Sequence, residues 1–326
     1  MTSTAVHTTE LVVGGSVRHA SRLITEIENG SPAAREVLAR LLPHCGSAQR
    51  VGITGPPGAG KSSLTASLIK EIRAQGRTVG VIAVDPSSPF SQGALLGDRD
   101  RMLEAASGDA DVFIRSLAAR GAAGGLAVAV NDVVDVMDAM GKDVVIVETV
   151  GVGQGELEIA KIAHTVVLVL VPGYGDALQA MKAGVTEIAD VVAVNKGDLP
   201  EAAGAVENLR SQDYVRRDPT ADRTWVVPVL KVSALRREGI RELAGLVDDH
   251  YRFTGDSAWR SEIERNRRHA QFLSSVTERL RAELAAIPPD AFDDGRFSDP
   301  HLAADEFVTD IVRVRAHLRA GGLATN

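Results

Sequence analysis

Short runs of apolar residues alternate along the chain with longer segments of helical periodicity. These runs predict strands at residues 50–54, 79–84, 112–115, 143–147, 165–171, 190–194 and 225–229. Most are separated by segments of 12–20 residues with a helical pattern, which is typical of an α/β fold with a doubly wound, mostly parallel sheet. The tracts "VVIVE" and "TVVLVLV" are apolar without alternation, as expected for strands covered on both faces.

The N-terminal segment lacks this alternation. Residues 1–10 are expected to be disordered, and residues 15–29 and 32–43 are expected to form two helices. Pro32 suits the first helical position of the second helix, and Ser31 suits its N-cap.

The C-terminal segment also lacks strands. Beyond about residue 255 the pattern predicts helices over 257–286 and 302–320, both rich in Arg and Glu. We therefore expect three parts, namely an N-terminal helical extension, a central α/β domain and a C-terminal helical segment, at residues 1–45, 46–255 and 256–326.

Composition excludes several classes of function. The 326 residues carry a formal net charge of −7 and no long basic run, which argues against nucleic acid or an anionic membrane as the main partner. The single cysteine, Cys45, excludes an internal disulfide and a cysteine-built metal site. The eight histidines show no ligand spacing. There is no membrane-length apolar run and no secretory signal pattern, so we expect a cytoplasmic protein.

A phosphate-binding loop follows the first predicted strand. The stretch "GPPGAGKSS" fits G-x-x-x-x-G-K-[ST], with a strand before it and a helix after it. Backbone N–H groups of such a loop surround phosphate oxygens, Lys61 reaches the outer phosphates, and the Ser62 hydroxyl ligates Mg²⁺. Pro56 excludes the subclass that sends a second loop lysine across a dimer interface. The predicted nucleotide contacts here are Gly55, Pro56, Pro57, Gly58, Ala59, Gly60, Lys61, Ser62 and Ser63.

A second motif predicts which base is bound. "NKGD" follows an apolar strand, and the Asp198 carboxylate can accept hydrogen bonds from N1–H and the 2-amino group of guanine. Adenine offers neither donor, so a site of this kind rejects it by a factor on the order of 10⁴. The other predicted contacts are Asn195 and Lys196, with Ser233, Ala234 and Leu235 from "SAL" beside the guanine O6.

Three acids follow predicted strands in the half of the chain with the phosphate loop. Asp85 and Glu148 come at strand ends, which converge on the ligand crevice of a doubly wound sheet, and Asp98 lies in a long loop. Glu148 is one methylene longer than the usual Asp, so we expect it to reach the Mg²⁺ shell from a strand lying farther away. The alternative role for these acids, strongest for Asp98, is capping a helix.

Three further side chains have open roles. Arg99 or Arg101 could neutralise charge in the transition state or lie on a solvated helix face. Gln154 could position the attacking water or belong to a mobile loop. Val152 stands where many small G proteins have a water-orienting Gln, so we expect slow intrinsic hydrolysis.

Together, "GPPGAGKSS", "VDPSSPFSQGALLGDRDRM", "FIRSLAARGAAGGLA", "ETVGVGQGE" and "NKGDL" resemble the MeaB/ArgK/MMAA GTPases, whose third motif begins with Glu. The resemblance covers roughly residues 15–255. It implies a homodimeric GTPase that gates adenosylcobalamin loading of methylmalonyl-CoA mutase and protects that enzyme. Asp85, Asp98 and Glu148 match the family's Mg²⁺-binding and catalytic acids.

The resemblance also implies three switches. Asp85 to about Asp98 matches the first, Glu148 to Glu158 the second, and Val171 to Lys182 the third, which signals to the mutase. The matching signalling residues are Gly173, Asp176, Gln179 and Lys182. Tyr174 and Ala177 depart from what family members often carry at these positions.

Some alternatives remain open at this stage. The segment 256–326 fits the family's dimerisation arm, but could instead pack on its own domain. A nickel-insertion GTPase would need a Cys/His cluster, which the sequence does not show. A small-molecule kinase would need a lid and an acceptor pocket, and most kinases take ATP. The partner could also be an isobutyryl-CoA mutase or a related enzyme.

Overall fold

The computed structural model describes most of the chain. The described residues are 3–86, 108–119, 125–149, 158–173, 188–211 and 215–286, with 299, 301, 304, 305 and 309. They divide into two compact units, residues 1–274 and 275–326. The predicted boundaries at 45 and 255 stay a prediction.

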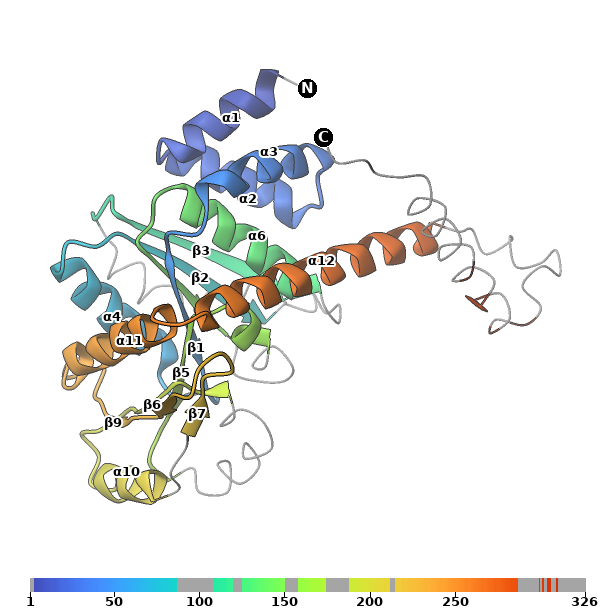
Figure 1. The fold of residues 1–326 in the computed structure, drawn as a ribbon. Coiled ribbons are helices and arrows are strands. Elements are labelled where there is room, and N and C mark those ends of the chain that lie inside the picture. Colours follow the sequence, from blue (N-terminus) through green and yellow to red (C-terminus); the bar gives the residue numbers. More distant parts are fainter. Residues whose placement is uncertain are drawn as a thin grey trace. The chain divides into compact units, whose positions relative to one another are not determined.

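The first unit is built on a seven-stranded sheet in the order β3-β2-β4-β1-β5-β6-β9, and every pair in it is parallel (Figure 1). The strands are β1 (Gln49–Thr54), β2 (Val79–Pro86), β3 (Val112–Ala119), β4 (Val144–Glu148), β5 (Thr165–Leu170), β6 (Val191–Val194) and β9 (Val229–Lys231). This confirms the predicted doubly wound fold, because helices cover both faces.

Side-chain alternation within single strands divides the core into two layers. Val144 and Ile146 of β4 pack with α4 (Lys61–Ala74) and α11 (Ile240–Gly255), which lie together in Figure 1. Val145 and Val147 face the opposite way, into the core that includes α6 (Gly125–Ala139). An apolar run without polar alternation is what two covered faces require.

Three N-terminal helices, α1 (Ser3–Val13), α2 (Val17–Glu28) and α3 (Pro32–Leu41), join the α6 layer, and the 3₁₀ turn η1 (Leu42–His44) follows them. The expectation of disorder over residues 1–10 is wrong for residues 3–10, which belong to α1, a helix held by the burial of Ala5, Thr9 and Val12. Ser31 does precede α3, but its side chain makes no capping hydrogen bond.

The predicted strand at 225–229 is two strands. β8 (Thr224–Val226) pairs with β7 (Val215–Arg217) in a separate antiparallel hairpin, and β9 begins only after Pro228. Pro228 has no N–H to donate to a ladder, so it interrupts the run between β8 and β9. The helix α10 (Ala202–Arg210) packs with β5, β6 and β9.

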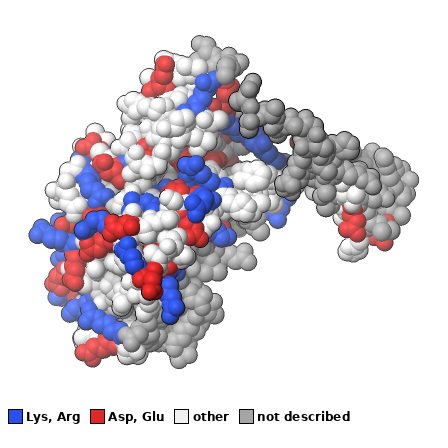
Figure 2. All heavy atoms as spheres, viewed as in Figure 1, with Lys and Arg blue, Asp and Glu red and all other residues white. Residues whose placement is uncertain are grey.

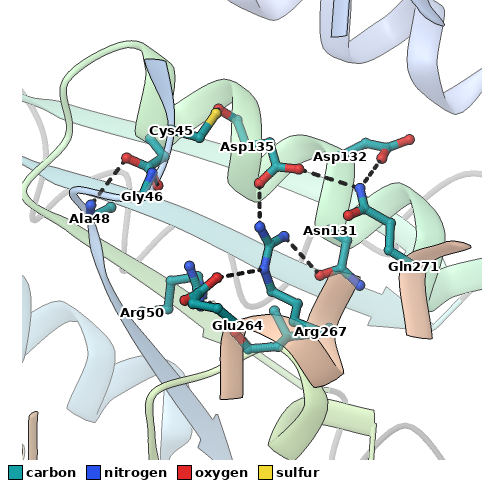
Figure 3. A network of polar contacts seen from close by, with 12 residues as sticks. Cys45, Gly46, Ala48, Arg50, Asn131, Asp132, Asp135, Glu264, Arg267 and Gln271 are labelled. Carbon is teal, nitrogen blue, oxygen red and sulfur yellow. Dashed lines mark hydrogen bonds and ion pairs between the residues drawn. The ribbon is translucent and has the colours of Figure 1, made fainter. Parts of the chain in front are cut away.

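The last described helix, α12 (Trp259–Ala285), agrees with the prediction over 257–286, whereas most of 302–320 lies outside the described residues. Its first half belongs to the first unit and is attached there by buried charges. Arg267 forms an ion pair with Asp135 of α6 at 2.9 Å, and both are 3% exposed (Figure 3). Beside it, Gln271 donates to Asp132 at 2.7 Å.

A second part of this attachment lies at the amino edge of the sheet. Glu264 pairs with the fully buried Arg50 of β1 and accepts a hydrogen bond from His164 Nε2 at 2.7 Å. His164 Nδ1 accepts the backbone N–H of Arg50 at 3.0 Å, so the ring proton of neutral His164 is on Nε2. Burial and the charge of Arg50 lower the pKa of His164 to about 4, which keeps the ring neutral. We call these five residues, Arg50, Asp135, His164, Glu264 and Arg267, the amino-edge network.

Two surface properties complete the picture. Figure 2 shows basic and acidic side chains interspersed over the described part of one face. Among the described residues, no helix is both long and apolar enough to cross a membrane.

Candidate nucleotide-binding site

The phosphate loop connects β1 to α4 at the carboxyl edge of the sheet. Two of its glycines are required by close approaches. A Cβ on Gly55, whose φ is 141°, would lie 2.1 Å from the Val169 carbonyl oxygen, and one on Gly60, at φ 83°, would lie 2.5 Å from Asn195 Nδ2. The loop ends at Gly60, and the 14-residue helix α4 begins at the next residue. The free N–H groups of its first turn attract anions.

Lys61 begins α4 and is turned back over the loop. Its ammonium donates to the carbonyl oxygens of Gly55 at 3.0 Å and Pro56 at 3.2 Å, and the residue is 7% exposed. A cation held by neutral carbonyls can exchange them for phosphate oxygens, which bind it more strongly.

Glu148 ends β4 and reaches the same helix. Ser62 Oγ donates to Glu148 Oε1 at 2.6 Å, and Thr65 Oγ1 donates to Glu148 Oε2 at 2.6 Å. The expectation that Glu148 comes from a more distant strand is wrong, because β4 is the direct neighbour of β1 and Glu148 is in register with Ile53. The additional methylene of Glu instead lets one carboxylate contact two hydroxyls a helical turn apart.

This donor set fits a magnesium ion. Mg²⁺ prefers oxygen ligands and commonly takes one or two protein groups together with phosphates and waters. The Ser62 hydroxyl and the Glu148 carboxylate are buried oxygen donors beside the phosphate loop. Among the described residues, no group of three or more Cys, His, Asp or Glu could hold a metal, so phosphates and waters would have to complete the shell.

Asn195 connects the phosphate loop to the loops predicted to hold the base. Its Nδ2 donates to the carbonyl of Ala59 at 2.9 Å, and its Oδ1 accepts the N–H of Ala234 at 3.1 Å. The side chain is 3% exposed. Three segments from distant parts of the sequence are thus held in one arrangement by a single amide, a role that the sequence did not reveal.

Asp198 and Ser233 lie together at the predicted base site. Ser233 Oγ donates to Asp198 Oδ1 at 2.7 Å, and this hydrogen bond lowers the pKa of Asp198 below its ordinary value. The carboxylate is therefore ionised and fixed, as an acceptor of two guanine donors must be. Gly197 is required between the loops, since a Cβ there would lie 2.8 Å from the Val232 carbonyl oxygen. Lys196 and Leu235 are exposed.

Other predicted site residues are only partly described. The backbone of Asp85 lies in β2, two residues beyond Ala83, which is in register with Glu148. Gly173 lies in the turn after β5 with φ 84°. Outside the described residues are Asp98, Arg99, Arg101, Val152, Gln154, Asp176, Gln179 and Lys182.

One contact at the site escaped prediction altogether. Thr65 is fully buried and bonded to Glu148, yet the phosphate-loop motif ends before it. Its position three residues after Ser62 places both on one face of a helix, a spacing that could have drawn attention to it.

Residues 20–288 match the family model described as "Methylmalonyl Co-A mutase-associated GTPase MeaB". The chain belongs to the MeaB family. It is 45% identical over 305 residues to a putative GTPase of Pyrococcus abyssi, covering 91% of this chain and 94% of that protein. It is 34% identical to the GTPase ArgK of Escherichia coli, covering 79% of each. This MeaB-family chain is therefore a P-loop GTPase.

A solved structure agrees on the fold. The crystal structure of an LAO/AO transport system kinase matches with a TM-score of 0.65 at 24% sequence identity, over 99% of this chain and 95% of that one. At this identity the likeness shows the shared architecture alone.

Proposed function

We propose that this GTPase binds guanine nucleotide and Mg²⁺ at the carboxyl edge of its sheet. The observation that carries the proposal is the convergence of the phosphate loop, Asn195 and the Asp198–Ser233 pair. Asp198 accepts from guanine, and Lys196 packs its stem over the base. Backbone N–H groups of Gly55–Ser63, apart from the two prolines, bind the phosphates. In Ser233–Leu235 the first two N–H groups are donated to Glu238 and Asn195, so the N–H of Leu235 is the one offered to the guanine O6.

Hydrolysis uses charges held in place before the substrate arrives. Lys61 exchanges its loop carbonyls for phosphate oxygens and neutralises charge that develops in the transition state. Ser62 and Glu148 would hold Mg²⁺, together with Asp85 and Asp98, and the ion would supply further neutralisation of the phosphate charge. Gln154 is our candidate for orienting water.

We further propose that the partner is an adenosylcobalamin-dependent acyl-CoA mutase, and methylmalonyl-CoA mutase is our first candidate. Support comes from the description of the matching family. In this proposal the GTP state gates loading of adenosylcobalamin and protects the mutase, in the cytoplasm. Gly173, Asp176, Gln179 and Lys182 carry the signal.

The partner proposal has a kinetic test. Val152 cannot orient water through its side chain, so the isolated protein should turn over GTP at below about 1 s⁻¹. The mutase should accelerate turnover at least about ten-fold, or roughly 1.4 kcal/mol of barrier. Turnover is measured with and without the mutase for wild type and Lys182→Ala. If no cobalamin-dependent mutase of the same cell accelerates GTP turnover, the partner proposal is wrong. Equal acceleration of wild type and Lys182→Ala would leave the partner proposal standing and rule out only the role of Lys182.

We also propose a homodimer formed through residues 256–326. Phe272 and Leu273 of α12 support it, since their exposed fractions are 63% and 49% and exposed apolar side chains favour association. Analytical ultracentrifugation of the protein used in the turnover assay measures its mass in solution. A monomer at the assay concentration would overturn the dimer proposal.

A further inference from the structure

A buried threonine lies one turn into α4, behind the predicted metal ligand. Thr65 is fully buried, and its hydroxyl donates to Glu148 Oε2 at 2.6 Å. On the other side of the same carboxylate, Ser62 Oγ donates to Oε1, also at 2.6 Å. Glu148 itself is 6% exposed. One carboxylate is thus held at both oxygens by two hydroxyls of the same helix.

The direction of the Thr65 hydroxyl is the informative detail. A helical Ser or Thr commonly donates to the carbonyl four residues earlier. Thr9 does so to Ala5 at 2.8 Å, and Ser67 of α4 does so to Ser63 at 3.0 Å. Thr65 donates its single proton to the end of a neighbouring strand instead. A hydrogen bond to a charged acceptor is stronger than one to a carbonyl, so the contact is a restraint on Glu148 rather than on the helix.

We propose that Thr65 is a positioning residue for the Glu148 carboxylate. The inference rests on the proposed Mg²⁺ site and adds the group that orients it. A glutamate has one more rotatable bond than the aspartate usual at this place, and therefore more conformational freedom to lose when it is fixed. Thr65 holds Oε2, which leaves Oε1 directed to Ser62. If the Ser62 oxygen turns toward a cation, Thr65 still keeps the carboxylate in place.

This role predicts an effect on metal dependence rather than on the fold. Thr65→Val keeps the shape and removes only the donor, so the carboxylate loses one of the two hydroxyls that bond to it. We expect the Mg²⁺ concentration needed for half-maximal retention of GDP to rise about ten-fold, equivalent to about 1.4 kcal/mol. Thr65→Ser keeps a hydroxyl at the same position, so its half-maximal Mg²⁺ concentration should lie closer to that of the wild type than that of Thr65→Val does.

The experiment follows dissociation of a fluorescent GDP analogue at increasing Mg²⁺. The reference variant is Ser62→Ala, which removes a proposed ligand. The matched control is Thr254→Val, which makes the same substitution at a fully buried threonine of α11 whose hydroxyl donates to the Tyr251 carbonyl. It should overlay the wild type. Dissociation in excess chelator should be the same for Thr65→Val and wild type, because the restraint acts through the metal.

The outcomes separate the inference from the proposal beneath it. If Ser62→Ala shifts the Mg²⁺ titration and Thr65→Val does not, Thr65 is structural and the inference is overturned while the metal site stands. If wild-type dissociation does not respond to Mg²⁺, the proposed metal site fails and takes the inference with it.

Two further variants keep the test decisive. Should Thr65→Val not fold, Thr65→Ala, which adds no bulk and favours the helix, replaces it. In a Glu148→Ala background, Thr65→Val should add no further shift, because a residue that acts only through Glu148 has nothing left to position. An additional shift in that background would overturn the inference.

Discussion

At the carboxyl edge of the sheet, Lys61 donates to two loop carbonyls and Asp198 accepts from a serine hydroxyl. At the amino edge, Arg50 and Arg267 are held by carboxylates from other elements. A carbonyl or hydroxyl that contacts a charge can be exchanged for a charged ligand at a gain, whereas removing one member of a buried ion pair leaves the other charge uncompensated. Substitutions at the first edge should therefore affect binding, and substitutions at the second should affect folding.

The largest expected effect is at the carboxyl edge. Asp198→Asn replaces an acceptor for guanine with a group that presents a donor, so GTP affinity should fall by a factor on the order of 10³ to 10⁴, about 4 to 5.5 kcal/mol. Xanthosine triphosphate, which carries an oxygen where guanine carries its 2-amino group, should bind better than to wild type. Calorimetric titration with both nucleotides measures this. Unchanged GTP affinity would rule out the base site.

Next in size is Arg267→Met at the amino edge. The substitution leaves Asp135 buried without its ion pair, which should lower the free energy of unfolding by about 3 to 5 kcal/mol. Nucleotide affinity of the folded protein should not change. Urea unfolding provides the measurement, and Arg268→Met, at an exposed position one residue along α12, should cost less than about 0.5 kcal/mol. Equal losses in the two variants would contradict the comparison.

The smallest of the three effects depends on pH. Because burial and Arg50 hold the pKa of His164 at about 4, against an ordinary 6.5, the unfolded chain binds more protons here than the folded one in that interval. The stability from this residue is complete above pH 6.5 and is lost as pH falls to about 4, a change of about 3 kcal/mol.

His164→Gln keeps an N–H that can reach Glu264 but cannot titrate. The difference in unfolding free energy between wild type and variant, measured by urea unfolding from pH 7 to pH 4, isolates this contribution from those of other groups. A difference that does not vary with pH would show that His164 does not titrate as stated. GTP binding at pH 7 should be equal in the two proteins.

How far the sequence leads depends on whether a feature is local. The sheet was predictable because most of its strands contain a short apolar run, and the prediction failed at Pro228, where one run serves two sheets. Helix α1 was missed because its threonine-rich sequence has low helix propensity. It forms through the tertiary burial of Ala5, Thr9 and Val12.

The same division applies to the two edges. The residues proposed for the carboxyl edge fall in short motifs, so they could be named from the sequence. Thr65 lies outside those motifs, and although its helical spacing from Ser62 is visible in the sequence, its contact with Glu148 depends on where β4 ends. The amino-edge network joins residues up to 214 positions apart, as Arg50 and Glu264 are. No local pattern distinguishes such an arginine from an exposed one.

The single amide of Asn195 has a thermodynamic consequence for the two ends of a nucleotide. Since it is bonded to Ala59 on one side and to Ala234 on the other, a shift of either loop strains the other. Binding of the triphosphate, which orders the phosphate loop, should therefore also favour binding of the base. Linkage requires binding of the base to favour binding of the triphosphate by the same free energy. The binding free energies of guanosine alone and pyrophosphate alone should add up to less than that of the joined molecule. Each of the two should also strengthen the binding of the other.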